Sequence, residues 1–160
     1  MYRTILLAYD GSREGRLALR EGALLAQTCN ARVVLMAVVE PSVGYGMAID
    51  PAVAYLPPER TEDFQNILDE GVARLNRMGL TPEARLESGL PVERITAVAA
   101  EISADLVVVG HQKQGVMARW LLGSVTASLS DSLSCSLLVA RTEVSDDALF
   151  AQNAATTSKP

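Results

Sequence analysis

The sequence predicts an α/β protein built around one parallel sheet, and two patterns carry this prediction. Short, nearly continuous apolar runs rich in Val, Ile and Leu alternate with longer stretches in which apolar residues recur every three or four positions. The first pattern is typical of strands buried on both faces, and the second is typical of amphipathic helices. Strands and helices that alternate at this spacing imply right-handed crossovers and a doubly wound open sheet.

Five strands are expected. Four of them are the buried apolar runs 4–9, 32–39, 105–109 and 136–140. The fifth, 82–88, is a weaker candidate in which apolar and polar residues alternate. Because alternation indicates a strand that is not covered on both faces, we expect this strand nearer an edge of the sheet.

Four helices are expected between the strands. A narrow face of mainly small residues spans 15–29, which would let that helix approach the sheet closely. A second apolar face spans 64–78, and Gly79 is placed to end the helix. Two further faces span 92–102 and 125–133.

Two segments lack such periodicity. Residues 41–60 hold four of the seven prolines and two glycines, which predicts a long surface loop. Residues 143–160 form a polar, flexible C-terminal tail in this interpretation. The expected organisation is therefore one domain over 1–142 followed by the tail.

Composition excludes several classes of protein. With 160 residues, 49% of them apolar, and a net charge of −5, the chain suits neither a disordered protein nor a nucleic-acid binder. No apolar run reaches the roughly 20 residues of a membrane span, so no membrane partner is expected. Two cysteines are too few for a disulfide framework, which favours a cytoplasmic location. Arginine supplies all but two of the fourteen cations; the lysines are Lys113 and Lys159.

The candidate ligand site lies where the strands end. Ligands of open α/β sheets bind beyond the carboxyl ends of the strands, where the strand order reverses. Asp10 follows the first strand, and a glycine-rich segment, 110–124, follows the fourth and leads into a helix with Ser124 as a good N-cap. Such a loop suits phosphate, although Val116-Met117 replace the Lys-Ser/Thr pair of a P-loop. The residues alone leave phosphate binding and ordinary turn geometry equally open.

One motif in this segment resembles the C-terminal signature of the universal stress protein family. The family pattern is glycine, two residues, glycine, nine residues, glycine and Ser/Thr, and it matches here at Gly110, Lys113, Gly123 and Ser124, with lysine in the middle position. The segments TILLAYDGS, VVLMAVVE and WLLGSVTASLSDSLSCSLLVAR are also similar to family segments, in the same order. The resemblance covers residues 1–142.

The resemblance implies a fold and an assembly. The fold is a three-layer α/β/α sandwich of the adenine nucleotide alpha hydrolase-like type, with a five-stranded parallel sheet of strand order 3-2-1-4-5. The switch point then lies between the first and fourth strands. Relatives pair the last strand antiparallel in a two-fold dimer, so we expect a cytoplasmic homodimer that acts in the stress response.

The resemblance also implies an ATP site. Asp10 would accept hydrogen bonds from the ribose, and the backbone at Val38 would contact the adenine edge. Gly110 would let the backbone approach the sugar and phosphates, which Arg119 and the start of the last helix would bind. The expected nucleotide-binding residues are Ala8, Asp10, Val38, Val109, Gly110, Lys113, Gly115, Arg119, Gly123, Ser124 and Val125. Magnesium would enter only as the counter-ion of the nucleotide, because a single histidine, His111, offers no histidine-based metal cluster.

Lys113 is the main departure from the family pattern. Its side chain would either obstruct the phosphates, leaving an interaction dimer that binds no nucleotide, or supply an ammonium group to them. Ala8 is a milder departure, because some ATP-binding relatives have proline there.

Other roles stay open for the remaining candidates. Asp10 could instead cap the following helix or pair with an arginine. No catalytic residue is expected, because no well-placed general base is evident, and ATP hydrolysis would at most be slow.

Overall fold

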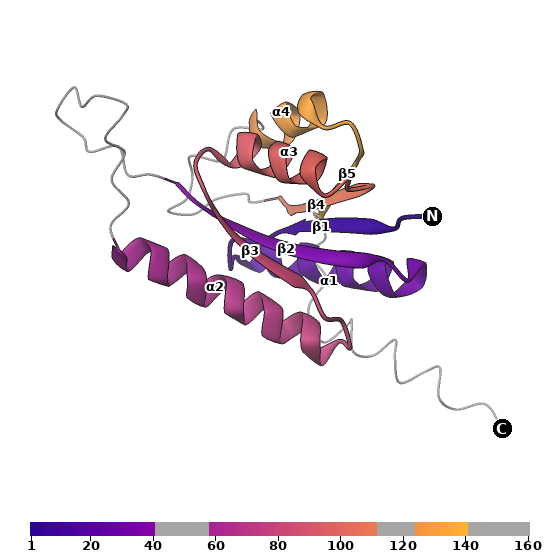
Figure 1. Cartoon of the computed structure of the whole chain (residues 1–160), viewed down its shortest axis with the longest axis horizontal. Coiled ribbons are helices and arrows are strands. Elements are labelled where there is room, and N and C mark those ends of the chain that lie inside the picture. Colours follow the sequence, from indigo (N-terminus) through magenta and orange to yellow (C-terminus); the bar gives the residue numbers. More distant parts are fainter. Residues whose placement is uncertain (41–57, 112–123, 141–160) are drawn as a thin grey trace.

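The computed structural model describes residues 1–40, 58–111 and 124–140, and its five strands form one parallel sheet in the order β3-β2-β1-β4-β5 (Figure 1). The predicted sheet and its strand order are confirmed, and the weakly patterned strand lies at an edge as expected. The strands are β1 (Thr4–Ala8), β2 (Arg32–Val39), β3 (Glu83–Ser88), β4 (Leu106–Gly110) and β5 (Ser136–Ala140).

In the described part of the chain, four helices cover the two faces of this sheet. Helices α1 (Arg13–Cys29) and α2 (Pro58–Arg77) pack on one face, and α3 (Pro91–Glu101) and α4 (Ser124–Ser132) pack on the other (Figure 1). The result is the three-layer α/β/α sandwich that the sequence led us to expect.

Helix α2 begins earlier than predicted. It starts at Pro58, so the last three residues of the range expected as a surface loop, 41–60, are helical. Proline lacks the N–H that a first-turn residue leaves unbonded, and its φ suits that position, so proline there starts a helix rather than a loop. The rest of that loop, 41–57, and the tail over 143–160 lie outside the described residues.

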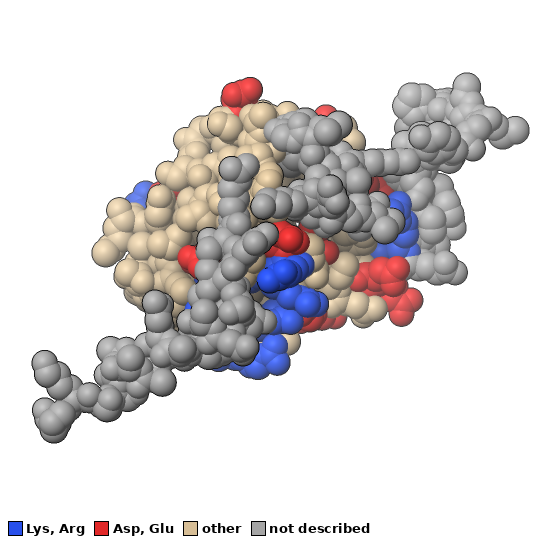
Figure 2. All heavy atoms as spheres, turned by 180° about the vertical axis from the view of Figure 1, so that it is seen from behind, with Lys and Arg blue, Asp and Glu red and all other residues tan. Residues whose placement is uncertain are grey.

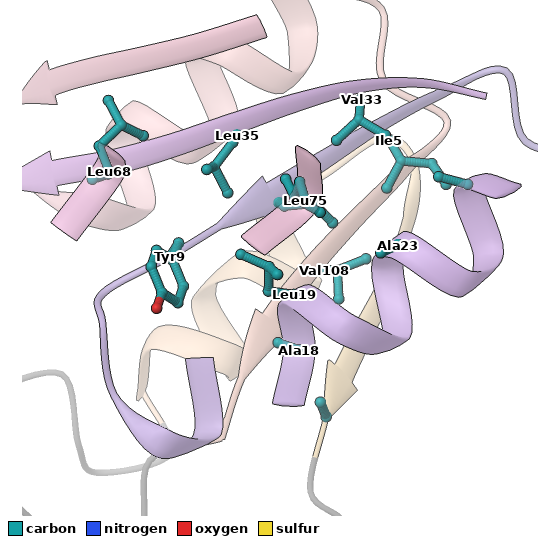
Figure 3. Close-up of a cluster of buried hydrophobic side chains, with 14 of the residues drawn as sticks. Ile5, Tyr9, Ala18, Leu19, Ala23, Val33, Leu35, Leu68, Leu75 and Val108 are labelled. Atoms are coloured by element: carbon teal, nitrogen blue, oxygen red, sulfur yellow. The ribbon is translucent and has the colours of Figure 1, made fainter. Parts of the chain in front are cut away.

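The core has two halves, one on each side of the sheet. The half beneath α1 and α2 is shown in Figure 3, where Leu35 and Val33 of β2 lie close to Ile5 of β1 and Leu75 of α2. All seven residues from Val33 to Val39 are buried, as a central strand covered on both faces requires. Burial on both faces therefore fixes the carboxyl end of β2, which lies at the edge of the sheet where a ligand would bind.

The small residues of α1 allow its close contact with the sheet. A Cβ added to Gly22 would lie 2.3 Å from a methyl carbon of Leu7 and 3.4 Å from Val108. Since real Cβ atoms do not approach so closely, a larger residue at Gly22 would push the helix away from the sheet. The small residues of the face predicted over 15–29 therefore allow α1 to pack closely against the sheet.

Candidate functional site

Three predicted site residues meet at the carboxyl edge of the sheet. In the parallel register, Ala8 of β1 lies opposite Met36 of β2, and Leu7 lies opposite Val108 of β4. Continuing this register by two residues places Asp10 level with Val38 and Gly110 level with Tyr9. Strand order reverses here between β1 and β4, where open α/β sheets bind their ligands.

Asp10 holds the turn between β1 and α1. Its Oδ1 accepts hydrogen bonds from the Ser12 amide at 3.0 Å and from the Ser12 hydroxyl at 2.6 Å. Ser12 is the N-cap of α1, and its Oγ accepts the Gly15 amide at 2.9 Å. Ser12 is therefore the residue that caps α1, and Asp10 supports this cap rather than capping the helix itself, which was one of the roles left open for it. These bonds use Oδ1, so they do not engage the second carboxylate oxygen, Oδ2.

Gly110 is required by packing at the end of β4. A Cβ at this position would lie 2.6 Å from the carbonyl carbon and oxygen of Glu14 and 2.7 Å from the Gly15 nitrogen. All three atoms belong to the backbone of the first turn of α1, which cannot yield as a side chain would. The glycine therefore lets the end of β4 pack directly against the backbone at the start of α1, next to Asp10.

Val38 and Val109, two other candidates, have buried side chains at this edge. Val38 is 3% exposed and Val109 is 8% exposed, and both belong to the core on the α3–α4 face, against which Ala8 also packs. Any ligand contact by these two valines would involve main-chain groups, as the sequence interpretation assigned to Val38.

The predicted phosphate segment is largely outside the described residues, including Lys113, Gly115, Arg119 and Gly123. Ser124 and Val125 form the start of α4, where a helix begins as predicted. Ser124 occupies the first helical position rather than the N-cap position expected for it.

Sequence reasoning missed a charged cluster directly beside Asp10. The Tyr9 hydroxyl donates a hydrogen bond to Glu70 of α2, and Glu70 also accepts one from Arg74 and lies 3.4 Å from the Nε atom of Arg16. The spacing of Glu70 and Arg74, four residues apart on a helix, was a visible signal for their pairing. Nothing in the sequence links Tyr9 to a residue 61 positions later.

The protonation states in this cluster are well defined. Burial, reinforced by the hydrogen bond to Glu70, raises the pKa of Tyr9 above its ordinary value. Burial alone would raise the pKa of Glu70, but hydrogen bonds from Tyr9 and Arg74 lower it below its ordinary value. At neutral pH the phenol is therefore a protonated donor and the carboxylate an ionised acceptor.

The opposite edge of the sheet carries a shallow hollow near the amino ends of β1, β4 and β5. Its lining residues come from the chain terminus and two loops: Met1, Tyr2, Ala104, Asp105, Ser134, Cys135 and Ser136. Burial and the charge of Asp105 raise the pKa of Cys135, which makes a reactive thiolate unfavourable there. The carboxyl edge is the stronger candidate site, because open α/β sheets bind their ligands beyond the carboxyl ends of the strands.

Two further observations concern the described ranges 1–40, 58–111 and 124–140. No group of three His, Cys, Asp or Glu side chains within them is placed to hold a metal ion. None of the helices in these ranges is both long and apolar enough to cross a membrane.

Seen from behind, the molecule carries acidic and basic side chains close to one another rather than in a patch of one sign (Figure 2).

A five-stranded parallel sheet of this order, with its switch point between β1 and β4, places the chain among α/β domains of the adenine nucleotide alpha hydrolase-like fold. The chain belongs to the universal stress protein family, whose sequence profile matches residues 1–141. The family suggested by the C-terminal motif is thereby confirmed.

Individual relatives agree with this assignment. A Staphylococcus aureus protein named as a universal stress protein is 30% identical over 145 residues, which cover 89% of this chain and 86% of that protein. A crystal structure of a universal stress protein in complex with cAMP is 26% identical, with a TM-score of 0.68, over 89% of this chain and 99% of that one. A family member from Burkholderia pseudomallei is 31% identical, with a TM-score of 0.66, over 86% of this chain and 95% of that one.

Proposed function

We propose that this chain is a universal stress protein that binds an adenine nucleotide at the carboxyl ends of β1, β2 and β4. The observation that carries the proposal is the convergence of Asp10, Val38 and Gly110 at the switch point of the sheet. The similar universal stress protein solved in complex with cAMP supports an adenine nucleotide as the class of ligand.

The proposed ligand is ATP with magnesium as its counter-ion. Asp10 accepts hydrogen bonds from the ribose hydroxyls through Oδ2, while Oδ1 keeps the turn in place. The main chain at Val38 contacts the adenine edge. The amides at the start of α4 and the preceding segment, with Lys113 and Arg119, bind the phosphates, because a helix N-terminus offers free N–H groups and a positive dipole end.

Calorimetric titration with Mg-ATP tests this proposal. The wild-type protein is expected to bind, and Asp10→Asn is expected to bind about tenfold more weakly. The asparagine keeps an acceptor at the Oδ1 position for Ser12 but replaces Oδ2 by an amide donor. Asp69→Asn, an exposed carboxylate of α2, is the matched control and should leave affinity unchanged. Absence of binding by the wild-type protein at millimolar Mg-ATP would reject the proposal.

Lys113 favours a second candidate, a dimeric interaction module that binds no nucleotide. The lysine replaces the middle glycine of the family motif. Lys113→Gly separates the two candidates. A gain of ATP affinity would mean that the lysine blocks the phosphates, whereas a loss would mean that its ammonium group binds them.

The proposed assembly is a cytoplasmic homodimer formed through β5. This strand is the last in the described sheet and pairs with β4 on one side, and an uncovered strand edge is a template for pairing with another strand. A domain over 1–142 that carries a separate tail is part of this proposal, as is at most slow hydrolysis of ATP.

A further inference from the structure

The turn that carries Asp10 is held by contacts from α2 as well as by its own hydrogen bonds. A Cβ added to Gly71 of α2 would lie 2.8 Å from the Tyr9 ring, and one added to Gly11 would lie 3.2 Å from Ile67. Helix α2 therefore packs against the residue before Asp10 and the residue after it. Gly11 also has a φ of +75°, a conformation that glycine adopts readily.

Tyr9 links the packing of α2 to the turn that carries Asp10. It is 3% exposed, its ring lies in the core near Leu19 and Leu35 (Figure 3), and its amide donates to the Met36 carbonyl at 2.8 Å. The ring also lies beside the first turn of α1, because a Cβ added to Gly15 would lie 3.4 Å from the Tyr9 ring and 2.4 Å from Oδ1 of Asp10. Fixing the Tyr9 side chain between α1 and α2 therefore fixes the place at which the Asp10 carboxylate meets the start of α1.

Glu70 joins three elements at this point. It accepts the Tyr9 hydroxyl at the end of β1, pairs with Arg16 in α1, and accepts a hydrogen bond from Arg74 in its own helix. The Arg16 amide in turn donates to the Ser12 carbonyl at 2.9 Å. The carboxylate thus holds both ends of the turn, Tyr9 before Asp10 and Arg16 after Ser12.

We propose that Glu70 is a positioning residue: by holding Tyr9 and Arg16, it fixes the turn that orients the Asp10 carboxylate toward the ribose of the bound nucleotide. This inference rests on the proposed function. Glu70 contacts Tyr9, Arg16 and Arg74, and it acts through the turn rather than by touching the ligand.

Amide hydrogen exchange in the absence of nucleotide tests the positioning directly. In Glu70→Ala and in Tyr9→Phe, the amides of Ser12 and Gly15 are expected to exchange about fivefold faster, because both amides bond within the turn. Asp69→Ala, one residue away on the exposed side of α2, is the matched control and should leave both rates unchanged. Unchanged Ser12 and Gly15 exchange in both test variants would overturn the inference.

Nucleotide selectivity provides a readout that a general loss of stability would not move. Both variants are expected to weaken ATP binding about fivefold and 2′-deoxy-ATP binding much less, since the deoxy compound lacks one of the hydroxyls assigned to Asp10. The double variant should bind no more weakly than the weaker single variant, because Glu70→Ala already removes the contact that Tyr9→Phe breaks. An equal loss for the two nucleotides would overturn the inference.

A further variant and the exchange measurement without nucleotide keep the test of Glu70 separate from the test of the proposed function. If Glu70→Ala does not fold, Glu70→Gln retains an acceptor for the Tyr9 hydroxyl but loses the charge that holds Arg16, and it is expected to show intermediate exchange rates. If the wild-type protein binds no ATP, the proposed function fails. The exchange rates then still decide whether Glu70 holds the turn.

Discussion

Gly110 illustrates at the scale of one residue how a glycine can meet two requirements. In the sequence it is the first position of the C-terminal motif of the universal stress protein family. In the structure, a side chain there would collide with the backbone of Glu14 and Gly15. The motif predicted the residue type, but the steric reason depends on a helix that lies almost a hundred positions earlier in the chain.

Gly110→Ala is therefore expected to reduce the free energy of unfolding by about 3 kcal/mol, since neither backbone segment can move aside cheaply. Gly79→Ala is the comparison. It has open space around its Cβ and is strained only by its φ of +79°, so it should cost about 1 kcal/mol. Urea unfolding of both variants measures the difference. Equal losses would show that β4 and α1 separate easily.

Asp105 predicts a pH dependence of stability. Hydrogen bonds from the amides of Arg3 and Thr4, at 2.7 and 2.8 Å, lower the pKa of this carboxyl below its ordinary value. A group whose pKa is lowered by folding contributes fully above its unfolded pKa of about 3.9 and loses that contribution as the pH falls through its folded pKa.

The advantage of wild type over Asp105→Asn in free energy of unfolding should therefore be constant above about pH 5 and shrink as the pH falls below about 4. Asp131→Asn, an exposed position in α4, serves as the control. Urea unfolding at a series of pH values provides the measurement. A difference that stays constant below about pH 4 would contradict the assignment.

At the same scale, sequence reasoning identified Asp10 but not what surrounds it. Position after a buried strand was enough to single out the aspartate. The open roles expected for Asp10 were a helix cap and an arginine partner, but its observed bond is a local one to Ser12, which is itself the cap. The contact of Tyr9 with Glu70 joins two distant segments. Hydrogen bonds between residues close in the sequence can be inferred from the sequence. Contacts between distant segments depend on how α2 packs against the sheet.

The helices and strands were predictable to the extent that hydrophobic periodicity defines them. The buried strands stood out because both faces are covered, and β3 was weaker because it lies at an edge. The start of α2 was missed because prolines and glycines suggested a loop, although proline also starts helices.

The end of α3 offers a test at the scale of an element. Ser103 follows the helix with a φ of 51°, in the left-handed region that residues with a Cβ adopt at a cost. Ser103→Gly is expected to raise the free energy of unfolding by about 0.5 kcal/mol, the relief of strain exceeding the added freedom of the unfolded chain. Thermal and urea unfolding measure the change.

Ser130→Gly supplies the opposite sign in the same experiment. Ser130 is exposed inside α4, so glycine there should reduce stability by about 0.5 to 1 kcal/mol. A loss of stability in both variants would show that the left-handed residue after α3 is not strained.

For the whole molecule, the proposed β5 interface predicts an effect of a single edge lysine. Ser136→Lys places a charge on an exposed position of β5, and charges on an edge strand oppose pairing with another chain. Sedimentation equilibrium should show dimers dissociating at higher protein concentration than in wild type.

Ser88→Lys makes the same change at an exposed position of the other edge strand, β3, and is expected to leave association unchanged. A wild-type protein that is monomeric at micromolar concentration would reject the dimer. Dissociation caused by Ser88→Lys alone would instead place the interface at β3.

The position of β1 at the centre of the sheet affects the order in which the chain can fold. One neighbour of β1, β2, follows it closely in the chain, but the other, β4, is synthesised about a hundred residues later, as the bonds of Thr4 to Asp105 show. Until then, one edge of β1 lacks the partner strand it has in the native fold. Closing so long a loop is entropically costly, so we expect slow final assembly and a nascent chain that needs protection from aggregation until β4 has emerged.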